Sequence, residues 1–71
     1  MVLLTNQEIN LLRDLYRGGA HLKYIVLLPD EVFTASRLEA KSMIKLEWSD
    51  NARLARLRAE GIQYVFDNNL N

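Results

Sequence analysis

Cysteine is absent from this sequence of 71 residues, and histidine, proline and tryptophan each occur once. Without cysteine, neither a disulfide nor a thiolate zinc site can reinforce the fold. The apolar runs at residues 1–4 and Tyr24–Leu28 are too short for a signal peptide or for the ~20 residues of a membrane span. We therefore expect a single cytoplasmic domain over residues 1–71 that does not enter a membrane and depends on well-patterned packing.

A net charge is also lacking, because nine basic residues are balanced by nine acidic ones. Bulk attraction to nucleic acid is therefore weak. The charges are unevenly placed, however, and six basic residues stand against three acidic residues between Thr34 and Ala59. This stretch is the candidate basic surface.

The residue types that support catalysis or metal binding occur here without the neighbouring residues that such sites require. His21 has no companion ligand or orienting carboxylate in a recognisable motif. Gly18-Gly19 lacks the Gly-Lys-Ser/Thr of a phosphate-binding loop, so we interpret it as a helix end. We expect no enzyme, no catalytic residue, no metal site and no cofactor, and we infer that the chain works by binding a macromolecule.

Capping and periodicity predict two helices. The segment Thr5-Asn6-Gln7-Glu8 has the form of a capping box, and the apolar residues after it recur at helical spacing, which predicts a helix over residues 6–17. Pro29 suits the first turn of a second helix, which we place over residues 30–43. Steps of three and four residues put three polar side chains of this helix on one exposed stripe: Thr34, Arg37 and Lys41.

Two further segments have short-range patterns. Ala20–Leu28 is either a buried strand or a short buried helix, because periodicity cannot separate the two over so few residues. Ile44–Trp48 alternates apolar and polar residues, which predicts a strand with its apolar residues facing the core. Trp48 either closes the core, which we favour, or lies exposed at the wing as a protein-contact residue. A turn is expected at residues 49–51.

The segment Ala52–Gly61 supports two interpretations. Its alanine, leucine and arginine favour a helix, which would make the chain a small α/β unit with residues 52–60 helical and Ile62–Phe66 as a final strand. Alternatively, it forms the second strand of a hairpin and leads into a short helix that begins near Ala59.

Three stretches resemble the winged-helix (winged helix-turn-helix) family: Leu4–Leu12, Val32–Ile44 and Arg56–Val65. The resemblance implies an α+β fold with three helices, a β-hairpin wing over residues 44–58 and a short C-terminal helix. The middle helix would come from Ala20–Leu28. Ser42 stands where a glycine is usual after the recognition helix, and Arg58 stands where a capping threonine is common.

The same resemblance implies a small DNA-binding protein, such as a transcriptional regulator or a phage or prophage accessory factor. So small a domain makes few phosphate contacts, and from its size we expect a homodimer. The helix over residues 30–43 would enter the major groove. The residues implied to contact DNA are Thr34, Arg37, Lys41, Lys45, Arg53 and Arg56. The alternative hypothesis is a protein-interaction module that inhibits or recruits another protein without touching DNA, and the zero net charge favours it.

Overall fold

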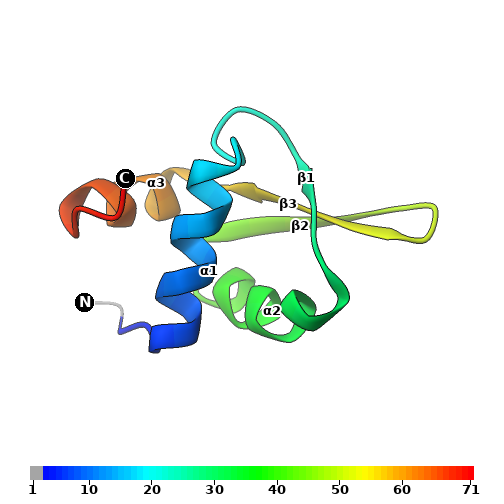
Figure 1. Ribbon diagram of the computed structural model, residues 1–71, viewed down its shortest axis with the longest axis horizontal. Coiled ribbons are helices and arrows are strands. Elements are labelled where there is room, and N and C mark those ends of the chain that lie inside the picture. Colours follow the sequence, from blue (N-terminus) through cyan, green and yellow to red (C-terminus); the bar gives the residue numbers. More distant parts are fainter. Residues whose placement is uncertain (1–2) are drawn as a thin grey trace.

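Three α-helices and a three-stranded antiparallel sheet make up the structure, a computed structural model that describes residues 3–71 (Figure 1). Met1 and Val2, the start of the short apolar run noted in the sequence, lie outside the described residues. The elements follow one another as α1 (Asn6–Arg17), β1 (Ile25–Val26), the 3-10 turn η1 (Pro29–Glu31), α2 (Val32–Ala40), β2 (Ile44–Ser49), β3 (Ala52–Leu57) and α3 (Ala59–Asp67).

Helix α1 begins at the predicted capping box. The backbone N–H of Thr5 donates to Glu8 Oε1 over 2.7 Å, and the backbone N–H of Glu8 donates to Thr5 Oγ1 over 3.2 Å. Two of the N–H groups that a helix start leaves without partners are thereby satisfied. The predicted helix over residues 6–17 is confirmed.

The middle helix expected from Ala20–Leu28 is wrong. This segment forms a turn followed by strand β1, which pairs antiparallel with β3. The backbone N–H of Leu27 also donates to the carbonyl of Arg53 over 2.8 Å. The edge of the sheet offers hydrogen-bond partners to this segment, and a pleated sheet suits β-branched side chains. For both reasons the segment forms a strand, which was the other alternative predicted from the sequence.

Helix α2 is shorter than the predicted range of residues 30–43. It ends at Ala40, and Ser42 adopts a left-handed conformation with φ 64°. The backbone N–H of Met43 then donates to the carbonyl of Leu38 over 3.0 Å, which closes the helix. Met43 therefore lies in the link to β2.

Strands β2 and β3 form the predicted hairpin, with Ile44 opposite Leu57 and Ser49 opposite Ala52. Asp50, at φ 52°, allows the tight turn. The helical alternative for residues 52–60 is wrong: β3 lies between β1 and β2 and bonds to both, and these ladders outweigh helix propensity. The turn end of the hairpin projects beyond the helices (Figure 1).

The core lies between the helices and one face of the sheet. Its buried apolar residues come from every part of the chain: Leu11, Leu12, Leu15, Ala20, Leu27, Ala35, Leu38, Met43, Ile44, Ala55, Leu57 and Val65. No helix in the described part of the chain is both long and apolar enough to cross a membrane. Residues 3–71 also contain no cluster of three or more potential metal ligands.

Candidate functional site

The hairpin has two chemically different faces. Ile44 and Leu57 are opposite one another and buried against the helices, so the next cross-strand pair, Lys45 and Arg56, points to the outer side of the sheet. Both of these side chains are exposed. Lys45 Nζ lies 3.6 Å from Glu47 Oε1, an exposed ion pair that contributes little stability.

Arg58 extends the basic outer face and was missed by the sequence analysis. It follows Arg56 by two residues in extended conformation and is exposed, so it continues the outward alternation of β3. The pairing of Ile25 with Ala55 places the preceding Tyr24 on this outer side as well. The period-two spacing of Arg56 and Arg58 carried this signal in the sequence.

Arg37 and Lys41 do not form a free basic stripe, because both contact the start of α1. Lys41 Nζ donates to Glu8 Oε1 over 2.7 Å and to the carbonyl of Leu3 over 3.0 Å. Arg37 Nε lies 3.8 Å from Glu8 Oε2, and the Arg37 guanidinium donates to Gln7 Oε1 over 3.3 Å. Their main contacts hold α2 against α1.

Glu8 is the one charged residue of the described chain that is fully buried. Burial raises the pKa of its carboxyl, but the hydrogen bonds from Lys41 and Thr5 and the positive charge of Lys41 outweigh that effect. The pKa of Glu8 therefore lies below its ordinary value, and the side chain is an anion that two basic residues of α2 neutralise.

Thr34 lies in acidic surroundings. It lines a hollow of about 270 Å³ between α1 and the start of α2, and three carboxylates line the same hollow. They are Asp14, Asp30 and Glu31. Carboxylates repel phosphate, so this side of α2 is a poor place for a nucleic-acid backbone.

Arg53 lies on the opposite face of the hairpin from Lys45 and Arg56. Its guanidinium carbon is 3.5 Å from the centre of the Trp48 ring, its cross-strand partner. Trp48 is 66% exposed, so the expectation that it closes the core is wrong. The alternation of β2 was predicted correctly, but the hairpin extends past the core before it reaches Trp48.

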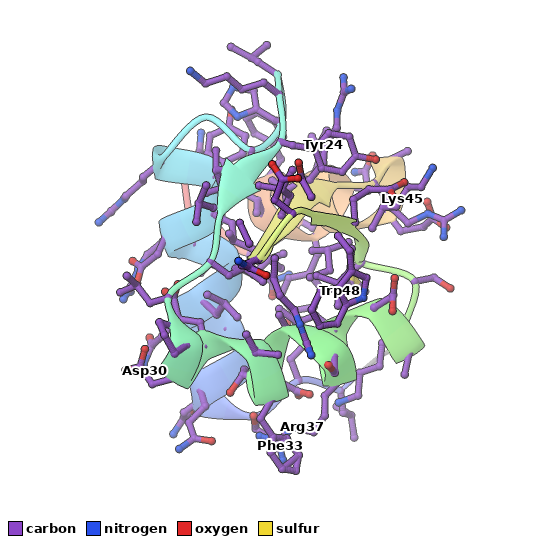
Figure 2. All side chains as sticks on the ribbon, turned by 90° about the vertical axis from the view of Figure 1, so that its right-hand side faces the viewer. Tyr24, Asp30, Phe33, Arg37, Lys45 and Trp48 are labelled. Atoms are coloured by element: carbon purple, nitrogen blue, oxygen red, sulfur yellow. The ribbon has the colours of Figure 1, made fainter. Side chains whose placement is uncertain are left out.

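In Figure 2, Lys45 lies on the right of the view above Trp48, and Arg37 lies near the bottom beside Phe33. The six residues implied to contact DNA thus fall into distinct surroundings. Lys45 and Arg56 share the outer face of the sheet, Arg53 stacks on Trp48, and Arg37 and Lys41 face α1.

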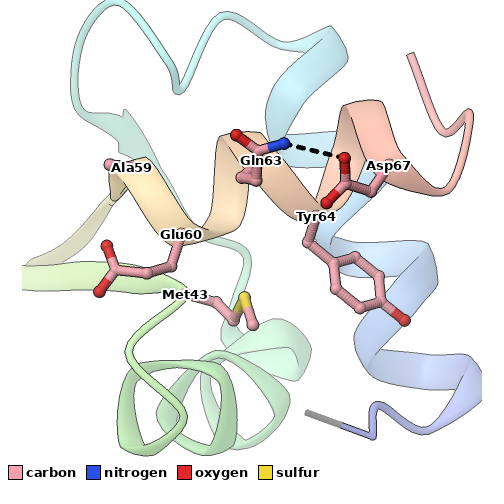
Figure 3. Close-up of a pocket in the computed structure, with 6 residues that line it drawn as sticks. All are labelled: Met43, Ala59, Glu60, Gln63, Tyr64 and Asp67. Atoms are coloured by element: carbon pink, nitrogen blue, oxygen red, sulfur yellow. Dashed lines mark hydrogen bonds between the residues drawn. The ribbon is translucent and has the colours of Figure 1, made fainter. Parts of the chain in front are cut away.

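A separate hollow of about 410 Å³ lies beside α3 (Figure 3). Met43, Ala59, Gln63 and Tyr64 line it together with Glu60 and Asp67, and Gln63 Nε2 donates to Asp67 Oδ1 over 2.8 Å. Its charged groups are both acidic, so it does not extend the basic outer face of the hairpin.

A scan against protein-family models, a search of curated proteins and a search of solved structures each gave no match.

Proposed function

We propose that the chain is a winged-helix-like protein that binds DNA through phosphate contacts from the outer face of its hairpin. The observation that carries this proposal is the cross-strand pair of Lys45 and Arg56, which Arg58 extends toward α3. Two cations at one cross-strand position destabilise a sheet by roughly 0.2–1 kcal/mol. A bound phosphate chain would offset that repulsion.

The hairpin, rather than α2, is the contact element in this proposal. Arg37 and Lys41 are engaged with Glu8, and Thr34 lies among carboxylates. Three basic side chains supply few phosphate contacts, so two copies on one duplex would strengthen binding. A regulatory role in transcription or in a phage or prophage would use binding of this kind.

The test is the affinity for a DNA duplex of arbitrary sequence, measured by fluorescence anisotropy over a series of salt concentrations. Three phosphate contacts predict a slope of about −2.7 in log affinity against log salt, from −0.9 per contact. The double variant Lys45→Glu/Arg56→Glu should lose at least tenfold in affinity at low salt. It should also have a slope nearer zero.

The double variant Arg13→Glu/Arg17→Glu is the matched control, because it makes the same change in net charge on α1. Its affinity should stay closer to that of the unmodified protein. Equal losses in the two double variants, or no binding by the unmodified protein at low salt, would contradict the proposal.

A second candidate function, binding to another protein, is supported by the opposite face of the hairpin. Trp48 is largely exposed there and carries the stacked Arg53. Tryptophan and arginine are the residues most enriched among the energetic centres of protein interfaces.

A further inference from the structure

An apolar groove lies beside the turn end of the hairpin, on the face opposite Lys45 and Arg56. We call it the Trp48 groove; it measures about 450 Å³. Its lining comes from the β1–α2 segment and from the hairpin: Val26, Leu27, Pro29, Val32, Trp48, Asn51, Ala52 and Arg53. Its size falls within the range of pockets that enclose small ligands, so it suits one or two side chains of a partner.

One large apolar side chain of this groove is exposed to a degree that folding does not explain: Trp48 is 66% exposed. Val26 also lines the groove, but its pairing with Leu54 directs its side chain to the outer side of the sheet. An exposed tryptophan is typical of residues that anchor a partner protein. The groove therefore favours a ligand with an apolar side chain.

Arg53 adds a charge preference to the groove. The Arg53 guanidinium is held against the Trp48 ring. Among the described residues, no carboxylate lies close enough to it, at 4.0 Å or less, to form an ion pair. Stacking occupies a face of the guanidinium and leaves its in-plane N–H groups able to receive a carboxylate. The held geometry also lowers the entropy lost when such a bond forms.

Four carboxylates adjoin the groove lining in sequence, but none of them is a lining residue: Asp30, Glu31, Glu47 and Asp50. Glu31 Oε1 accepts a hydrogen bond from the backbone N–H of Leu28 over 2.8 Å. Glu47 pairs with Lys45, and Asp30 lines the hollow beside α1 and lies apart from Trp48 in Figure 2. Among the described residues, Arg53 is the one charged residue that lines the groove.

We propose that the Trp48 groove binds an extended segment of a partner protein, with an apolar side chain against Trp48 and an aspartate or glutamate on Arg53. This inference rests on the second candidate function and is independent of DNA binding. Apolar complementarity would supply affinity, and the carboxylate would select the partner.

A displayed library of random peptides, selected on the intact protein, tests the inference. The enriched sequences should place Asp or Glu within a few residues of an aromatic or aliphatic residue. Selection on Arg53→Glu should instead enrich Lys or Arg near the apolar residue. Selection on Lys45→Glu/Arg56→Glu, changed only on the outer face, should give the same sequences as the unmodified protein.

The affinity of an enriched peptide can be followed through Trp48, the only tryptophan of the chain. Saturable change in its fluorescence is expected, with at least a tenfold weaker dissociation constant for Arg53→Gln. Circular dichroism and thermal unfolding of each variant establish that it is folded; Trp48 is exposed and Arg53 is half-buried near the turn, so both positions should tolerate the substitutions.

Three results would overturn the inference. Enrichment no greater than on Trp48→Ser would show that the groove binds no peptide. Enrichment without an acidic preference, or unchanged by Arg53→Glu, would remove the role of Arg53 but leave protein binding in place. A fluorescence change with protein concentration alone, or displacement of the peptide by duplex DNA, would assign the groove to a second copy or to DNA.

Discussion

Lys41 Nζ lies 2.7 Å from Glu8 Oε1 although the two residues are 33 positions apart in sequence, and this contact joins the end of α2 to the first turn of α1. The same Glu8 oxygen accepts from the backbone N–H of Thr5. A helix cap and a tertiary ion pair therefore share one carboxylate. Loss of that carboxylate should weaken both.

Glu8→Gln is expected to lower the free energy of unfolding at pH 7 by about 2 kcal/mol, because it removes the buried carboxylate that pairs with the partly buried Lys41 amine. Urea denaturation followed by circular dichroism measures the change. Asp14→Asn, on the exposed surface of the same helix, is the control and should change stability by less than about 0.5 kcal/mol.

The lowered pKa of Glu8 predicts how stability depends on pH. A carboxyl whose pKa is lower in the folded state stabilises the protein above its unfolded pKa, and that contribution is lost as pH falls through the folded value. The unmodified protein should therefore lose stability below about the ordinary value of 4.5. Glu8→Gln should show a shallower decline over that range; parallel curves for the two proteins would contradict the assignment.

Arg37 and Lys41 should differ in their contribution to stability although both face Glu8. Lys41→Met is expected to cost about 2 kcal/mol, because its amine makes a 2.7 Å hydrogen bond to a buried oxygen. Arg37→Met should cost about 0.5 kcal/mol, because its Nε is 3.8 Å away and its side chain is 42% exposed. Neither folded variant should lose more than about twofold in DNA affinity, and a loss as large as that of Lys45→Glu/Arg56→Glu would return α2 to the DNA interface.

Ser42→Gly should stabilise the protein by about 0.5–1 kcal/mol. Ser42 has φ 64°, a conformation that strains a residue with a Cβ but not glycine. Ser36→Gly is the matched control, because Ser36 lies within α2, where glycine costs about 1 kcal/mol. The two substitutions should shift the denaturation midpoint in opposite directions; shifts of the same sign would show that backbone conformation does not decide the outcome at residue 42.

Gly61→Ala should destabilise the protein, although alanine is normally the better residue inside a helix. A Cβ at residue 61 would collide with the backbone carbonyl of Met43, which cannot rotate away as a side chain can. We expect a loss of about 2 kcal/mol or more in thermal or urea unfolding. Gly19→Ala, at φ 92° with open space around it, should cost only the conformational strain of about 1–2 kcal/mol.

Local sequence patterns predicted the elements that local chemistry controls. The cap of α1 and the alternation of β2 both depend on residues within a few positions of one another. The sequence left Ala52–Leu57 open between a helix and a strand. The sheet decides for the strand, because this segment pairs with a neighbouring strand on each edge. Helix propensity describes only the local preference of a segment, so it does not include the effect of pairing partners that lie elsewhere in the chain.

The candidate site was harder to predict than the fold. Helical spacing placed Arg37 and Lys41 on one stripe, but it could not show that buried Glu8 faces them. Likewise, the alternation of β2 predicted the side of the sheet on which Trp48 lies. It could not predict that the hairpin has already extended past the core at that residue, which leaves Trp48 exposed. Charge, periodicity and spacing describe one segment at a time, whereas both surfaces depend on how segments pack together.

The number of residues in the hairpin turn determines which side chains lie on each face of the hairpin. Side chains alternate with a period of two, so a shift of β3 by one residue relative to β2 would exchange the sides on which its arginines lie. Arg56 would then point toward the core and Arg53 toward the outside. The turn at Asp50 and Asn51, which touches neither Lys45 nor Arg56, thus sets which chemistry each side of the molecule presents. An insertion or deletion of one residue in the turn would exchange the side chains that β3 presents on the two faces while Lys45, Trp48, Arg53 and Arg56 all remain in the sequence.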